Sequence, residues 1–111
     1  MADADTVRQG FGDAVNMTRK ELEDWLQTDA SKAAGQHDGG GESTGHASGR
    51  RIVEILGRRK DDLTDEDVVH MRKVHGYVRR HLEQKPDKSG AELEDATWTH
   101  SLRNWGHDPL K

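Results

Sequence analysis

The sequence predicts an all-α protein, a compact bundle of four to five short helices with a glycine-rich flexible loop. Three observations favour this fold class. Apolar residues recur at the three- and four-residue intervals of a helix face, and no stretch alternates apolar and polar residues as a half-buried strand does. Two stretches carry the start signal of a helix. With 111 residues the chain has the length of one domain, so we expect a single helical unit over residues 1–111.

The first expected helix, within residues 1–16, is weak. Gly10 and Gly12 each lower the stability of a helix by about 1 kcal/mol relative to alanine. Its apolar face is nevertheless clear, because four apolar residues fall at i, i+4, i+7 and i+8: Val7, Phe11, Ala14 and Val15.

The second expected helix, residues 18–31, opens with a capping box in the sequence MTRKEL. Thr18 stands at the N-cap and Glu21 follows three residues later, so each side chain can bind the backbone N–H of the other residue. Met17 and Leu22 occupy the two positions of a hydrophobic staple. Three residues form the face that we expect in the core: Leu22, Trp25 and Leu26.

Residues 32–47 are expected to form the flexible loop, because the eighteen residues from Lys32 to Gly49 include six glycines. The next helix, residues 48–60, covers the sequence GRRIVEILGRRK, and its start is left open between Ser43 and Ser48. Three aliphatic residues form its inward face: Ile52, Ile55 and Leu56.

The longest expected helix, residues 64–83, begins with the same signal in the sequence LTDEDV. Thr64 is the N-cap and Asp67 takes the capping-box position, where aspartate is a weaker partner than glutamate. Leu63 and Val68 form the staple. Five residues make up the apolar face: Val68, Met71, Val74, Val78 and Leu82.

A polar linker, residues 84–94, leads to a closing helix over residues 95–105. Trp98, Leu102 and Trp105 lie on one face of it at i, i+4 and i+7. Gly106 fits the left-handed residue that ends a helix, and Pro109 prevents continuation. Two interpretations remain open. Either this helix anchors the core, or Trp105 is exposed and has a contact rim of three residues: His100, Arg103 and His107.

The composition indicates a thin core, since 31% of the residues are hydrophobic and 34% are charged. The absence of cysteine excludes disulfides, cysteine zinc sites and thiol nucleophiles. No stretch has the layout of a signal peptide, and no apolar run is long enough to cross a bilayer. We therefore expect a cytoplasmic or nuclear protein with no membrane partner.

Signals for catalysis, cofactors and metals are weak. No serine stands in a nucleophile-elbow pattern, and most carboxylates fall on solvent faces where nothing raises a pKa. His70, His75 and His81 are spaced by five and six residues rather than by the one helical turn that suits zinc ligands. The glycine run lacks the Lys-Ser/Thr pair of a phosphate-binding loop. We expect no enzyme, no cofactor and no metal site.

The distribution of charge gives the strongest functional lead. The formal net charge is −4, but residues 1–49 carry −5, residues 50–85 carry +3 and residues 86–111 carry −2. Eight residues of the basic island could contact nucleic-acid phosphates: Arg50, Arg51, Arg58, Arg59, Arg72, Lys73, Arg79 and Arg80.

On the longest helix these cations share faces, because Arg72 and Arg79 are seven residues apart, as are Lys73 and Arg80. Gly76 lies on the same side and would let a phosphate or a backbone approach closely. Two other interpretations stay open. The charges can form ordinary solvated helix faces, or they can recognise an acidic protein.

Four stretches carry a family resemblance: VNMTRKELEDWL, SGRRIVEIL, LTDEDVVHMRKV and NWGHDPLK. In this order and spacing the chain, from about Val15 to Lys111, resembles the small bacterial and fungal proteins classed as domain of unknown function 3140. GRRIVEIL and GHDPLK are the most specific parts. The resemblance implies a mostly helical fold, and some members carry a DNA-binding label, but it brings no established active site. The opening helix also resembles the short helices of SAP-type DNA-binding modules.

The favoured function is therefore non-enzymatic binding of nucleic acid, with duplex DNA as the expected partner and phosphates as the contacts. Direct reading of bases is disfavoured, because no helix starts with a set of Asn, Gln or Arg residues suited to base edges. The alternative is a protein–protein interaction module, which binds an acidic protein or a second copy of itself.

Overall fold

The computed structural model describes residues 4–34 and 42–111, and within them the chain is all-α, as predicted. Seven α-helices and one 3₁₀ helix follow one another along these residues, and five of the α-helices have eight residues or more. In chain order they are α1 (Ala4–Ala14), α2 (Arg19–Leu26), α3 (Asp29–Ala33), α4 (Thr44–Leu56), η1 (Lys60–Asp62), α5 (Asp65–Leu82), α6 (Gly90–Glu94) and α7 (Thr97–Asn104).

Both predicted capping boxes are confirmed. The Thr18 side chain accepts a hydrogen bond from the backbone N–H of Glu21, whose carboxylate accepts one from the backbone N–H of Thr18. Thr64 and Asp67 form the same pair of hydrogen bonds at the start of α5. These boxes satisfy backbone donors that the first turn of a helix leaves without partners.

The expected helix over residues 18–31 is divided into α2 and α3. The Thr28 hydroxyl accepts a hydrogen bond from the backbone N–H of Ser31, donates one to the carbonyl oxygen of Trp25, and so caps a new helix. A threonine side chain that binds nearby backbone groups competes with a continuous helix. The expected linker over residues 84–94 likewise contains a short helix, α6.

α4 begins at Thr44 with Ser43 as its N-cap, at the early end of the range left open by the sequence, so residues 44–47 are helical and not part of the expected loop. Its glycines serve close packing. A Cβ atom at Gly49 would come within 2.6 Å of the carbonyl oxygen of Asn104, and one at Gly45 within 3.2 Å of the Trp105 indole nitrogen. α4 ends at Leu56 rather than at residue 60. Residues 35–41 of the expected loop lie outside the described residues.

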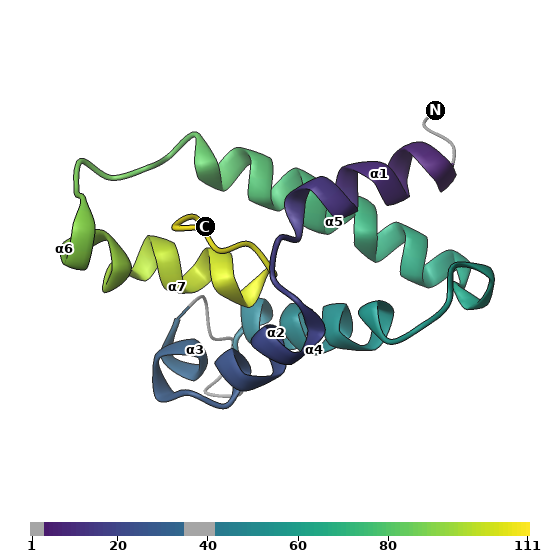
Figure 1. Ribbon diagram of the computed structural model, residues 1–111, viewed down its shortest axis with the longest axis horizontal. Helices are drawn as coiled ribbons and strands as arrows, with labels where there is room; N and C mark the ends of the chain where they lie inside the picture. Colours follow the sequence, from purple (N-terminus) through teal and green to yellow (C-terminus); the bar gives the residue numbers. More distant parts are fainter. Residues whose placement is uncertain (1–3, 35–41) are drawn as a thin grey trace.

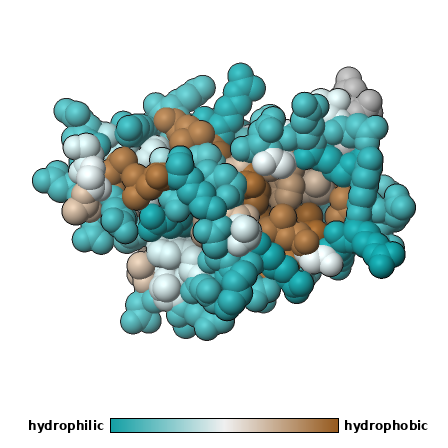
Figure 2. Space-filling view, in the orientation of Figure 1, coloured by the Kyte–Doolittle hydropathy of each residue, from teal (hydrophilic) through white to brown (hydrophobic). Residues whose placement is uncertain are grey.

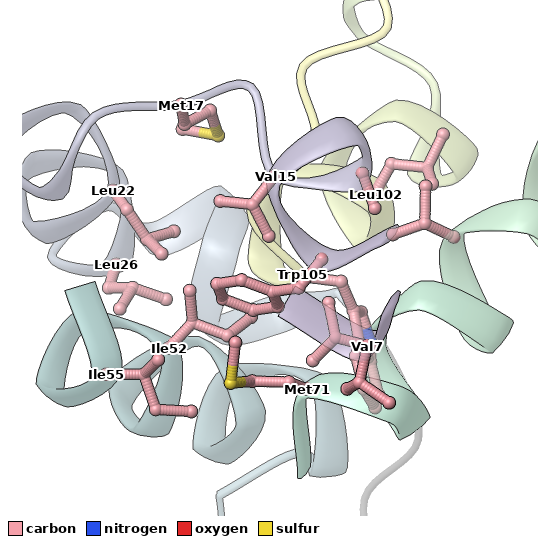
Figure 3. Packing of buried hydrophobic residues seen from close by; sticks show 14 residues of the cluster. Val7, Val15, Met17, Leu22, Leu26, Ile52, Ile55, Met71, Leu102 and Trp105 are labelled. Carbon is pink, nitrogen blue, oxygen red and sulfur yellow. The ribbon is translucent and has the colours of Figure 1, made fainter. Parts of the chain in front are cut away.

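Figure 1 shows α1 lying along α5 on one side of the molecule, with α4, α2 and α7 on the other side. α7 packs against α2, α3, α4 and α5, so the last helix holds the two sides together. Figure 3 shows side chains from both sides meeting in one core. Its buried members are Val7, Phe11, Ala14, Val15, Met17, Leu22, Leu26, Ile52, Ile55, Met71, Val74, Val78, Leu102 and Trp105.

One residue of the predicted apolar faces is wrong and four are only partly buried. Leu82 is 39% exposed, because it is the last residue of α5, where the chain leaves the packed helices. Four residues pack against the core from its margin: Trp25, Leu56, Val68 and Trp98. The other residues of the predicted faces are buried.

The C-terminal segment anchors the core. Trp105 is 3% exposed and Leu102 is fully buried, so the interpretation of Trp105 as an exposed contact residue is wrong. Gly106 has a φ of 82°, as predicted for the residue that ends the helix. Its N–H binds the carbonyl of Arg103 and the N–H of His107 binds that of Leu102, which is a Schellman motif.

Two polar pairings join distant parts of the chain. The buried Asn104 side chain accepts hydrogen bonds from Trp25 Nε1 at 2.8 Å and Ser31 Oγ at 2.5 Å, and its amide donates to the Ser31 carbonyl at 3.0 Å. Asn16 and Asp108 exchange two hydrogen bonds between the α1–α2 connection and the C-terminus. Helical periodicity gives no sign of either pairing.

Candidate nucleic-acid interface

The eight predicted phosphate-contacting residues separate into two groups in the structure. Arg50 and Arg51 lie on α4, and Arg58 and Arg59 follow it directly. The other four are on α5: Arg72, Lys73, Arg79 and Arg80. The two groups differ in whether carboxylates already pair with them, and this difference decides which of them are available to a ligand.

Arg51 and Arg58 both pair with one buried carboxylate, that of Asp67. Arg51 Nη2 donates to Asp67 Oδ1 at 2.8 Å, and Arg58 Nη1 lies 2.6 Å from both carboxylate oxygens of Asp67. Asp67 is fully buried, whereas the two arginine side chains are about one third exposed, at 32% and 37%. The Arg51–Asp67–Arg58 triad therefore connects α4 and the segment after it to the start of α5.

Asp67 also caps α5 through Thr64, so both the helix cap and the two arginines stabilise its negative charge. Burial raises the pKa of Asp67, but hydrogen bonds from the backbone and side chain of Thr64 and from Arg58 outweigh burial and lower it to about 2. The charged carboxylate is consequently the form that the fold stabilises. A phosphate would have to compete with this carboxylate for Arg51 and Arg58.

Arg50 is paired as well, although it faces solvent. Its Nε and Nη2 atoms donate to the two oxygens of Glu42 at 2.7 and 2.5 Å. Hydrogen bonds from Arg50 and His46 lower the pKa of Glu42 to about 2, so this carboxylate is charged at neutral pH. Arg59 is exposed at the connection between α4 and η1 and forms no ion pair with another residue of the described ranges.

The α5 cations have a different environment. Arg72, Arg79 and Arg80 are exposed, and among residues 4–34 and 42–111 no carboxylate pairs with them. Lys73 Nζ lies 6.0 Å from the centre of the Trp105 ring, a cation–π contact that leaves its charge uncompensated. We call these four residues the α5 basic face.

Val69 precedes the cations of the α5 basic face along the helix, and Gly76 lies among them. Val69 is 65% exposed on the solvent side of α5. A Cβ atom at Gly76 would meet only Arg80 Nη1, at 3.5 Å, so the space beside Gly76 is open apart from this flexible side chain. The surface is therefore low enough for a ligand backbone to approach the helix.

The family described as "Protein of unknown function (DUF3140)" matches residues 10–103, which include all eight basic residues. The chain belongs to this family. No curated protein and no solved structure has a significant similarity to it.

In this DUF3140 protein a ladder of stacked rings runs beside the α5 basic face. The ring planes of successive neighbours are within 17° of parallel, and the centroids are 4.0 to 6.3 Å apart. In order, the rings belong to His70, Trp105, Tyr77, His81 and Trp98. The ladder joins α5 to the C-terminal segment and fixes the helix that carries the cations.

The ladder holds two histidines in the neutral form at neutral pH. Burial lowers the pKa of His70, and the nearby charges of Lys73 and Arg51 lower it further. Burial also lowers the pKa of His81. The ladder was not predicted from the sequence, although Tyr77 and His81 at i, i+4 are a local signal for one of its steps.

Within residues 4–34 and 42–111, no three His, Asp or Glu side chains gather closely enough to hold a metal ion. None of the described helices combines the length and the apolar character needed to cross a bilayer.

Proposed function

We propose that this protein is a non-enzymatic binder of duplex DNA, and that the α5 basic face contacts the phosphates. One observation carries the proposal. Four cations lie on the solvent side of one long helix, and no carboxylate of the described residues neutralises them. In a chain of net charge −4, such a local concentration of unpaired positive charge suits a polyanion.

The dimensions of the α5 basic face fit a phosphate backbone. Arg72 and Arg80 are eight residues apart, which is about 12 Å along a helix. Duplex DNA carries one negative charge per roughly 1.7 Å of its axis. A helix of this length can therefore place several cations near phosphates at the same time.

The ends of α5 indicate which part of the helix makes contact. Its first turn contains two exposed acidic residues, Asp65 and Glu66, and these would repel a phosphate placed at the N-terminus. The exposed cations instead follow from Arg72 onward, and Arg79 and Arg80 are in the last turn. Contact through the middle and the C-terminal end of α5 favours phosphate binding over insertion of the N-terminus among base edges.

A polarisation titration of labelled random-sequence duplex DNA at two salt concentrations tests the proposal. We expect the R72A/R79A/R80A variant to bind more weakly to every sequence. The slope of log affinity against log salt should fall by about one for each phosphate contact removed. The R19A/K20A/K32A variant removes three exposed cations from α2 and α3 and should bind like the wild type.

Two results would reject the proposal. The first is a wild-type protein that gives no polarisation change with duplex DNA at low salt. The second is an equal loss of affinity in the two triple variants, because the α5 cations would then act only through net charge. In that case these residues are an ordinary solvated helix face.

A further inference from the structure

An open groove lies between α1 and α4, separate from the α5 basic face. Its volume is about 620 Å³. Figure 2 shows a hollow with hydrophobic, brown surface between these two helices, bordered by hydrophilic, teal residues. Five apolar side chains from α1, α4, α5 and the residue after η1 line it: Phe11, Ile55, Leu56, Leu63 and Met71.

These five residues differ in how much surface they offer. Phe11, Ile55 and Met71 belong to the core and are 3 to 5% exposed, so they form a firm base. Leu56 and Leu63 are partly buried and pack against the core from outside. An apolar hollow with a polar border is typical of a surface that another molecule covers.

The charged residues at the groove are predominantly positive. Arg58 shares Asp67 with Arg51, and this triad keeps one positive charge in excess. Arg8 and Lys60 both pair with Asp5, which leaves a second positive charge in excess. The apolar base is thus flanked by two uncompensated positive charges, which complement an acidic ligand.

The form of the groove selects the kind of ligand. Small molecules are usually enclosed over most of their surface, whereas this hollow is open to solvent (Figure 2). Addition of a strand requires a sheet edge, and the described residues contain no strand. Recognition of a proline-rich segment requires a groove lined by several aromatic rings, and Phe11 is the one aromatic residue here. Of these modes, an amphipathic helix is the one that an open groove with an apolar base fits.

We propose that the α1–α4 groove binds an acidic amphipathic helix of a partner protein. Aliphatic side chains at i, i+4 and i+7 of that helix lie against Leu56, Leu63 and the base of the groove. Its carboxylates face Arg8, Lys60 and the Arg51–Asp67–Arg58 triad. This site does not depend on DNA binding, and its failure leaves the role of the α5 basic face unchanged.

The test uses three labelled helical peptides of about five turns. The first has leucines at i, i+4, i+7 and i+11 and glutamates elsewhere. The second has lysine in place of glutamate, and the third has serine in place of leucine. Fluorescence polarisation should detect binding of the first peptide alone, and added salt should weaken it because charge pairs contribute.

Three protein variants locate the binding site. L63E places a charge among the apolar residues, and R8E/K60E reverses the positive side without altering a core residue. Each should weaken binding of the acidic peptide by about tenfold or more. L110E adds the same charge at an exposed apolar residue of the C-terminal segment that does not line the groove, and it should leave the affinity unchanged.

Several outcomes would overturn the proposal. These are no binding of the acidic peptide, equal binding of the lysine peptide, and unchanged affinity in R8E/K60E. Sedimentation supplies a further outcome. Self-association of the wild type that L63E abolishes would assign the groove to a second copy of the chain instead of an acidic partner.

Discussion

The arginines of α4 and the cations of α5 belong to one basic stretch of the sequence, but the fold uses them in different ways. Arg51 and Arg58 approach one buried aspartate and connect two helices. Arg72, Arg79 and Arg80 point their charges at solvent with no carboxylate partner among the described residues. The difference teaches that a basic residue is available to a ligand only if no acidic residue already holds it.

The energetic consequences of the two environments differ as much as their geometry. Removing one partner of a buried ion pair costs about 3–5 kcal/mol, because the other charge is left without compensation in the interior. Exposed substitutions away from caps and networks change stability by about 0.5 kcal/mol or less. Mutations in the first group should therefore act on folding, and mutations in the second on binding.

The largest expected effect is that of Asp67→Ala. This change removes the buried carboxylate, leaves two arginines without their acceptor and opens the capping box of α5. We expect the free energy of unfolding to fall by about 3–5 kcal/mol. Urea denaturation followed by circular dichroism measures this change in the free energy of unfolding. The control is Asp65→Ala, which changes an exposed residue directly after the N-cap. Equal losses of stability in the two variants would contradict the role of Asp67.

Next in size is a comparison of two double variants that each remove two arginines. R51A/R58A should lower the free energy of unfolding by about 3 kcal/mol, since Asp67 stays buried with only the cap to stabilise it. R72A/R79A should change it by about 0.5 kcal/mol or less. The comparison fails if thermal and urea unfolding give the two variants the same stability.

The Arg51–Asp67–Arg58 triad should also make the stability of the fold depend on pH in the acid range. The pKa of Asp67 is lowered to about 2 in the fold, below its ordinary value of 3.8. The unfolded chain therefore takes up the proton first, and stability that is present above pH 3.8 is lost as the pH falls toward 2. Urea midpoints measured across this range should fall in the wild type. R72A/R79A should follow the same curve, and a wild-type curve that stays flat would contradict the assignment.

The smallest expected effect concerns the ring ladder. Because burial lowers the pKa of His81 below its ordinary 6.5, the unfolded chain binds the proton more readily, and stability decreases as the pH falls below 6.5. His81→Phe keeps a stacked ring and removes an Nε2 atom that has no partner in the described structure. The variant should lose part of this pH dependence and none of its stability at neutral pH. A steeper dependence in the variant would contradict the explanation.

Much of the fold could be predicted because local rules determine it. Thr18, Thr64 and Gly106 act at helix ends through contacts a few residues away, and all three were identified from the sequence. The start of α4 could not be fixed in this way. Gly45 and Gly49 resemble loop residues in the sequence, but they are needed where α4 meets Asn104 and Trp105 of the C-terminal segment.

The candidate site was harder to predict because ion pairing is non-local. Arg51 and Arg58 are seven residues apart and so share a side of the helix expected over residues 48–60, a pattern that suits a phosphate as well as a carboxylate. The choice depends on Asp67, which a separate helix brings into place. Asn104 is a similar case, since its partners Trp25 and Ser31 lie more than seventy residues earlier in the chain.

The division of the cations can be observed in one NMR titration. Each arginine Nε–H group has its own resonance, and short random-sequence duplex DNA is added at low salt to protein labelled with ¹⁵N. We predict that the signals of Arg72, Arg79 and Arg80 shift with DNA concentration, while those of Arg51 and Arg58 stay in place. Shifts at Arg51 and Arg58, or no shift at the three α5 arginines, would contradict the account.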